Sequence, residues 1–148
     1  MLPLQVRQRL KSIHTTEAGC IFKNPVDLNV FSGPEMLLNT VETIAACDQV
    51  DLPIIHLTFD AWALIEQKDI VRPYLDSILK LNTRANKPLA VVLHCVATSE
   101  GKRFAAEAHL RLSEAGFPVY PSVGRAATAI NKVIQYHEHH QMRQEDDS

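Results

Sequence analysis

Apolar residues recur along this chain with two spacings, and each spacing predicts one type of element. Repeats at three and four residues are typical of helices that pack one face on a sheet. Short apolar runs of four to seven residues, bounded by turn residues, are typical of buried strands. The pattern therefore predicts helices over residues 2–13, 35–47, 69–86, 99–115 and 122–136, and strands over residues 26–30, 53–59, 88–94 and 117–120.

The order of these elements predicts the fold class. Residues 53–59 and 88–94 are continuous apolar runs rather than alternating ones, which is typical of parallel strands covered on both faces. The helix over 69–86 is long enough to serve as the crossover that a parallel connection needs. Strands and helices that alternate in this way predict an α/β protein with a doubly wound parallel sheet of about four strands.

The stretch from Asn24 to Glu35 joins a predicted strand to a predicted helix. Pro25 fixes its own φ and favours an extended Asn24, so the chain is expected to enter residues 26–30 extended. Ser32 and Glu35 have the spacing of a capping box at a helix start. In an open α/β sheet, such a junction lies at the carboxyl end of a strand, where ligands usually bind.

Length and charge narrow the class of protein. We expect a single domain over residues 1–136 and a polar C-terminal tail over 137–148. A net charge of −2, from 15 basic and 17 acidic residues, disfavours nucleic acid and membrane surfaces as partners. With no leader-like segment and no apolar run long enough to span a bilayer, a cytoplasmic location is expected, with Cys20, Cys47 and Cys95 as free thiols.

Polar residues that follow the predicted strands are the candidate site. Because parallel strands end at one edge, these residues are expected to gather there, either to face an anion at helix N-termini or only to cap helices. Asp27 and Asp60 also follow strands, although helix capping is the commoner use of such residues. The five glycines are scattered singly, so no nucleotide loop is predicted, and no catalytic residue is assigned. The helix-start candidates are Ser32, Gly33, Thr98, Ser99 and Ser122.

Histidines offer three further possibilities. His14, before a small-residue stretch, is either a nucleophile or part of a turn, and the turn explains the pattern at least as well. His56 and His94 lie in strand runs and are either core or pocket residues. Residues 137–140 have enough ligand atoms for a metal, but their position favours a solvated tail, so no metal site is predicted.

Five short motifs together resemble one family. They cover about residues 4–136, and their order matches the C-terminal part of the NDP-forming acyl-CoA synthetases, which include ADP-forming acetate-CoA ligase and succinyl-CoA synthetase. The motifs are Asn24-Pro25-Val26-Asp27-Leu28, Cys47-Asp48 with Val50-Asp51, Lys87-Pro88, Glu114-Ala115-Gly116-Phe117-Pro118-Val119-Tyr120, and Arg125-Ala126 with Ala129.

This resemblance implies a fold and a role. The fold would be a flavodoxin-like three-layer sandwich that packs beside the domain bearing the phosphorylated histidine and helps form the active site. Asn24, Asp27, Phe59 and Asp60 would lie on loops that face this active site. No tightly bound cofactor is implied; CoA, nucleotide and phosphate would be substrates of the assembled enzyme.

The N-terminus differs from the family pattern, and this difference leaves two main hypotheses. Relatives begin the domain with a strand, a Gly-rich turn and a helix, which would precede Leu4 here. A partner chain, self-association or direct pairing of the remaining strands would fill that place. The chain is then either part of a synthetase with CoA-binding and ATP-grasp partners, or a non-catalytic, self-associating module. A flavin or mononucleotide binder fits less well, because no loop is rich in Ser, Thr and Gly.

Overall fold

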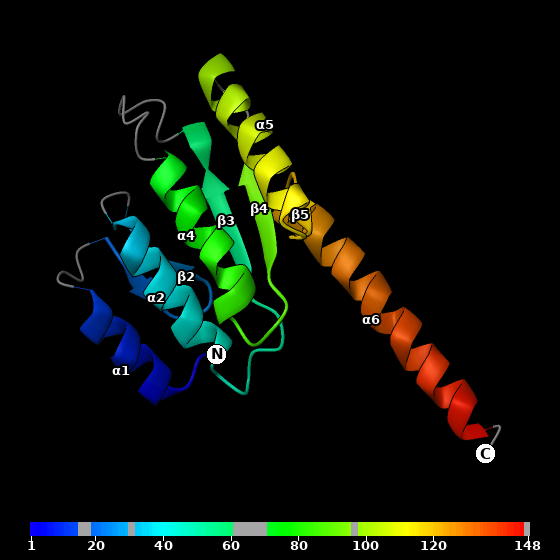
Figure 1. Ribbon diagram of the computed structural model, residues 1–148. Helices are drawn as coiled ribbons and strands as arrows, with labels where there is room; N and C mark the ends of the chain where they lie inside the picture. Colours follow the sequence, from blue (N-terminus) through cyan, green and yellow to red (C-terminus); the bar gives the residue numbers. More distant parts are fainter. Residues whose placement is uncertain (15–18, 30–31, 61–70, 96–97, 147–148) are drawn as a thin grey trace.

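The computed structural model describes residues 1–14, 19–29, 32–60, 71–95 and 98–146 (Figure 1). Helices and strands alternate along most of this length, as the sequence pattern predicts. The elements are α1 (Leu4–Ile13), β1 (Ile21–Phe22), β2 (Val26–Asp27), α2 (Pro34–Ala45), β3 (Ile54–Thr58), α4 (Val71–Arg84), β4 (Ala90–His94), α5 (Ser99–Glu114), β5 (Val119–Tyr120) and α6 (Val123–Asp146).

Three parallel strands form the main sheet, in the order β3-β4-β5. β3 and β4 pair along their whole length, with Ile54 opposite Ala90 and Thr58 opposite His94. β5 adds a shorter pairing on the other side of β4. The α/β class and the parallel sheet are confirmed, and the arrangement is consistent with a flavodoxin-like fold. The described residues place three strands in this sheet rather than about four.

The main core lies between this sheet and helices α2, α4 and α5. Ile55 and Leu57 of β3, with Val91 and Leu93 of β4, contribute the sheet side of this core. The helices contribute buried residues such as Leu38, Leu75, Ile78, Phe104 and Leu112. β4 is buried on both faces, as its continuous apolar run predicts, because Ala90 and Val92 are also fully buried.

The second face of β3 is open, which corrects the prediction that residues 53–59 are covered on both sides. Burial alternates along the strand, with Ile55 and Leu57 inside and Ile54, His56 and Thr58 exposed. We call these three exposed residues the open face. Among the described strands, β3 lies at one edge of the sheet and pairs with β4 alone.

The prediction that residues 26–30 form a strand of the parallel sheet was wrong for Val26–Asp27, and residue 30 lies outside the described residues. Val26–Asp27 pairs with Ile21–Phe22 in an antiparallel ribbon of two strands. Only Lys23, Asn24 and Pro25 separate the two strands, which suits a hairpin but is too short for a parallel crossover. Phe22 anchors the ribbon in a second, smaller core with α1.

The predicted start of α2 differs from the structure, whereas the predicted end of α5 agrees with it. The capping box of Ser32 and Glu35 is not formed, because Gly33 is the N-cap of α2, no side chain caps it, and Pro34 occupies the first turn. At the other end of the chain, Gly116 has the expected left-handed conformation with φ of +88° after α5.

Helix α6 continues well past the sheet. Its first turns contact β4 and β5, and Figure 1 shows the rest projecting away from the other elements. The residues assigned from sequence to a polar tail, 137–146, continue this helix. Within the described residues, no helix is both long enough and apolar enough to cross a membrane.

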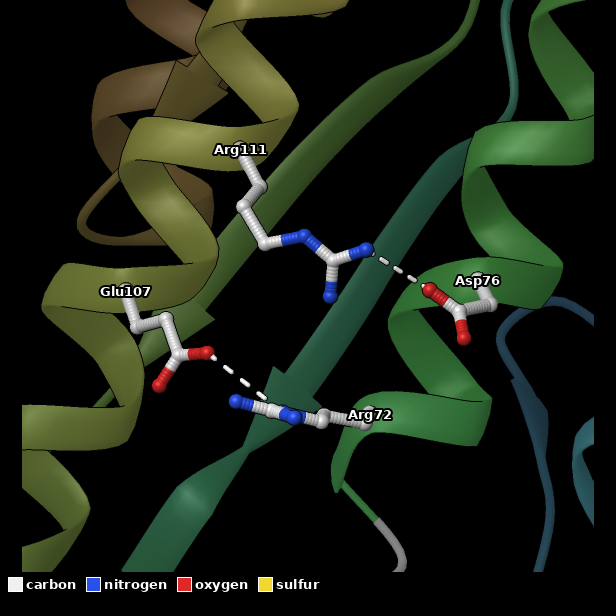
Figure 2. Close-up of polar contacts among 4 residues, drawn as sticks. All are labelled: Arg72, Asp76, Glu107 and Arg111. Atoms are coloured by element: carbon white, nitrogen blue, oxygen red, sulfur yellow. Dashed lines mark hydrogen bonds and ion pairs between the residues drawn. The ribbon is translucent and has the colours of Figure 1, made fainter.

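Two ion pairs connect α4 and α5 across the surface of the helical layer (Figure 2). Arg111 Nη2 lies 2.7 Å from Asp76 Oδ1, and Arg72 Nε lies 3.9 Å from Glu107 Oε1. Because these side chains are largely exposed, each pair is expected to contribute at most about 1 kcal/mol. The packing of α4 and α5 therefore depends mainly on their shared apolar core.

Lys87 connects the loop after α2 to the start of β4. Its Nζ donates hydrogen bonds to the carbonyl oxygens of Cys47 at 2.6 Å and Val50 at 2.7 Å. These bonds satisfy two carbonyls near the end of α2 with a positive charge, which is favourable at a helix C-terminus. The Lys-Pro motif of the sequence thus has a structural role in this chain.

Substitution Lys87→Met is expected to lower the free energy of unfolding by about 1–3 kcal/mol, because two carbonyls lose a charged donor. Urea unfolding followed by circular dichroism measures this change. Lys80→Met, at an exposed position of α4, is the matched control and should change stability by less than about 0.5 kcal/mol. Equal effects of the two substitutions would contradict the role given to Lys87.

Candidate functional site at the carboxyl edge of the sheet

The carboxyl ends of β3 and β4 lie side by side because the two strands are parallel and in register. Phe59 and Asp60 directly follow β3, and Cys95 directly follows β4. Thr98 is the N-cap of α5, which begins at this edge. Residues far apart in sequence therefore meet at one place, where ligands bind in open α/β sheets.

A hydrogen-bonded cluster joins these residues around one carboxylate. Asp60 Oδ1 accepts hydrogen bonds from the backbone N–H of Thr98 at 3.0 Å and from its hydroxyl at 3.2 Å. Cys95 Sγ lies 3.4 Å from the same oxygen, as a thiol donor. Thr98 Oγ1 in turn accepts from the N–H of Gly101 at 2.9 Å. We refer to Asp60, Cys95, Thr98 and Gly101 as the Asp60 cluster.

The Asp60 cluster is tightly packed, and Gly101 makes this packing possible. A Cβ atom at residue 101 would lie 2.7 Å from Thr98 Oγ1, 2.9 Å from Cys95 Sγ and 3.0 Å from Asp60 Oδ1. Those distances are too short for a methyl group. Glycine in the first turn of α5 therefore allows the carboxylate to approach the helix start closely.

The surroundings of Cys95 disfavour ionisation of its thiol. Burial raises the pKa of Cys95, and the hydrogen bond to Asp60 and the charge of Asp60 raise it further. Each effect disfavours the thiolate, which is the reactive form of cysteine. Cys95 is thus held as a neutral thiol that donates to the carboxylate, which is not the environment of a nucleophile.

Asp60 also fills the position that an external anion would take at the start of α5. The N-terminus of a helix carries a partial positive charge and unsatisfied N–H groups. Here a buried carboxylate, only 8% exposed, accepts from the capping residue itself. The arrangement stabilises the helix start and concentrates negative charge beside it.

The structure brings some of the sequence-predicted residues to this edge. Asp60 and Thr98 are in direct contact, and Thr98 caps α5 as predicted. Ser99 is the exposed first residue of α5. Phe59 is fully buried in the main core, so its side chain does not face a ligand. Ser122 accepts from the N–H of Arg125 at 3.3 Å and opens α6 after β5, as expected.

The remaining predicted residues lie elsewhere. Asn24 and Asp27 are exposed on the ribbon of β1 and β2, which does not join the parallel sheet. Ser32 is buried, with its hydroxyl 3.5 Å from Asn29 Oδ1, and Gly33 caps α2 through its backbone only. We expected all the helix starts to lie at one edge of the parallel sheet, because Val26–Asp27 was predicted to belong to that sheet. These residues form the ribbon instead, so the expectation fails for Ser32 and Gly33.

The histidines differ in their surroundings, since His14 is buried and His56 is exposed on β3. His14 is buried, its Nε2 lies 3.1 Å from Thr40 Oγ1, and its ring packs on Phe22, so the interpretation as a nucleophile has no support. Burial lowers the pKa of His14 and favours the neutral ring. His56 and His94 have ring centroids 5.7 Å apart. Burial, and then the charge of His94, lowers the pKa of His56.

Sequence reasoning missed two members of the cluster. Cys95 was interpreted only as a free thiol, and Gly101 as a scattered glycine. A glycine three residues after a capping threonine, inside a predicted helix, is the signal that could have indicated close packing, since glycine is otherwise unfavourable there. Among the described residues, no group of three or more His, Cys, Asp or Glu side chains could hold a metal ion.

Comparison with known proteins identifies a fold but no family. No family model and no curated protein matches the sequence. The crystal structure of PH0766 from Pyrococcus horikoshii OT3 is similar, with a TM-score of 0.55 and 18% sequence identity. The similarity covers 81% of this chain and 25% of PH0766, so this chain spans about a quarter of that protein's length. At this identity the likeness shows the fold alone.

Substitution Gly101→Ala is expected to lower the free energy of unfolding by about 1–3 kcal/mol, because the new methyl group must displace members of the Asp60 cluster. Gly124→Ala in α6 is the matched control, since nothing lies within 4 Å of its added Cβ. The control should leave stability unchanged or raise it by up to about 1 kcal/mol. Thermal unfolding measures both, and a neutral Gly101→Ala would contradict the close packing.

Substitution Asp60→Asn is expected to lower the pKa of Cys95, since it removes the negative charge that opposes thiolate formation. Iodoacetamide labelling of Cys95, followed across pH by peptide mass spectrometry, should reach half its maximal rate at lower pH. Because burial also raises the pKa of Cys95, a loosened structure would move the midpoint too, so thermal unfolding must show that Asp60→Asn is as well folded as the unmodified chain at the labelling temperature. Asp76→Asn, at an exposed position of α4, is the control, and an unmoved midpoint in Asp60→Asn would contradict the coupling.

Proposed function

We propose that this chain is a domain or subunit of an NDP-forming acyl-CoA synthetase. In this proposal it contributes a surface that faces the active site and does not supply the histidine that is phosphorylated. The surface is the carboxyl edge of β3 and β4, with the Asp60 cluster and the exposed start of α5. CoA-binding and ATP-grasp domains of the assembled enzyme are its expected partners.

The observation that carries the proposal is the convergence of Asp60 and Thr98 at this edge. It agrees with the resemblance of the five sequence motifs, which assigns Phe59 and Asp60 to an active-site loop. The fold shared with PH0766 is compatible with a family-level relation to acyl-CoA synthetase-like proteins. Because this chain spans about a quarter of PH0766, the remaining parts of such an enzyme would come from elsewhere.

The role proposed for the edge is to position an anionic group. Thr98 and Gly101 hold the start of α5 rigidly through their hydrogen bond, and Asp60 fixes that start against β3. Ser99 is exposed and is the first residue of α5, at the positive end of the helix. A phosphate of CoA or of a nucleotide would bind at this exposed side, while Asp60 remains on the buried side.

A second function is favoured by the same carboxylate. Asp60 already accepts the N–H of the capping residue, which reduces what the helix start offers to an external anion. The alternative is therefore a non-catalytic interaction module of the same fold. It would self-associate stably and have little affinity for CoA or nucleotide.

Calorimetric titration of the full chain with CoA, ADP and phosphate, each separately, tests the proposal. We expect heat of binding with at least one of these ligands, and we expect Ser99→Asp to weaken that binding about tenfold or more, because it adds a negative charge at the exposed helix start. Ser113→Asp, also exposed but at the opposite end of α5, is the matched control and should bind as the unmodified chain does.

The possible outcomes separate the two functions. Binding that Ser99→Asp weakens and Ser113→Asp does not would support the active-site surface. Absence of heat with all three ligands would overturn it and favour the interaction module. Binding that neither substitution affects would contradict the assignment of the carboxyl edge.

A further inference from the structure

Two histidines from neighbouring strands lie together on the side of the sheet that includes the open face. The strand register pairs Thr58 with His94, so His56, two residues before Thr58, is the diagonal neighbour of His94 on the same side. Their ring centroids are 5.7 Å apart, and the rings are tilted by 36° rather than stacked in parallel. The parallel pairing of β3 and β4 therefore brings two imidazoles to one place.

The backbone beneath this histidine pair is held firmly. β3 and β4 are paired along their whole length, and the residues that flank the two histidines in sequence, Ile55, Leu57 and Leu93, are buried in the main core. Only the side-chain torsions of the two histidines are then left to adjust. An ion that binds one ring therefore reaches the other with little further ordering of the chain.

Both rings are accessible and have no competing polar partner. His56 is exposed on β3, and His94 is half-buried at the end of β4. Within the described residues, neither ring takes part in a hydrogen bond or an ion pair. His14 differs, because its Nε2 lies 3.1 Å from Thr40 Oγ1. The nitrogens of the histidine pair remain available to a ligand from solution.

We propose that His56 and His94 together bind one divalent transition-metal ion of the zinc class, with water in the remaining coordination positions. Imidazole nitrogen suits zinc, copper and nickel ions, whereas Mg²⁺ and Ca²⁺ prefer oxygen ligands. The described residues offer no third His, Cys, Asp or Glu ligand here, so the site is open rather than closed like a structural zinc site. This proposal does not depend on the proposed function.

The separation of the rings agrees with one shared ion. Zn²⁺ binds an imidazole nitrogen at about 2.0–2.1 Å, so the ion lies roughly 3.2 Å from the ring centroid. Two rings on one tetrahedral ion then have their centroids about 5 Å apart. The observed 5.7 Å is close to this value, and a small rotation of the exposed His56 side chain closes the difference.

Titration of the full chain with Zn²⁺, followed by NMR of the ring carbon–proton signals of its seven histidines, tests the proposal. We expect the ring signals of His56 and His94 to shift together with one common midpoint. Mg²⁺ at the same concentrations should shift neither ring. Because each histidine has its own signal, binding by the histidines of residues 137–140 is distinguished from binding by this pair.

Single substitutions test whether the two rings share one ion. His56→Gln should raise the midpoint of the His94 shift at least tenfold, and His94→Gln should do the same for His56, because the second imidazole binds the ion intramolecularly. His109→Gln, at another exposed histidine but on α5, is the matched control and should leave both midpoints unchanged. Circular dichroism verifies that each variant is folded.

Four outcomes would overturn the proposal. The first is no shift of His56 and His94 up to about 1 mM Zn²⁺, which saturates any site of micromolar affinity. The second is a pair of shifts with different midpoints in the unmodified chain. The others are a midpoint that survives removal of the neighbouring imidazole and an equal effect of His109→Gln.

Discussion

The in-register parallel pairing of β3 with β4 is the constraint on which the rest of this structure depends. It places Ile55 and Leu57 beside Val91 and Leu93, so that one continuous apolar surface receives α2, α4 and α5. It also makes both strands end at one edge. Asp60 and Thr98 can meet only because of that coincidence, since 37 residues of the sequence separate them.

The Asp60 cluster stabilises the start of α5 and lies at the edge that we propose binds a ligand. The carboxylate, the capping threonine and the thiol satisfy one another, and Gly101 leaves the space in which they do so. A polar group at this depth would be costly without such partners. The same bonds give the start of α5 a buried negative side and an exposed side that offers Ser99. Binding of an anion at the exposed side would support the enzyme surface, and absence of binding would support the interaction module.

The sequence allowed the layers to be predicted more reliably than the pairing of the edge segments. Helical periodicity located α1, α2, α4 and α5, because each buries an apolar side, α2, α4 and α5 in the main core and α1 in the smaller one. Thr98 was identified as a cap, since its side chain acts on its own neighbours. The partner of Val26–Asp27 was not predicted, because Ile21–Phe22 is too short to give a strand pattern. His56 and Thr58 interrupt the apolar run of β3 at alternate positions, and the prediction of a strand covered on both faces overlooked this signal.

The central proposal is that the carboxyl edge of β3 and β4 binds an anionic ligand. Amide chemical shifts of the isotope-labelled full chain, recorded by two-dimensional NMR during titration with CoA, test it most directly. We expect the largest shifts at residues 98–101 and at Asp60, while the amides of Asn24 and Asp27 on the separate ribbon stay unchanged. Largest shifts on the ribbon, or no shifts at saturating CoA, would contradict it.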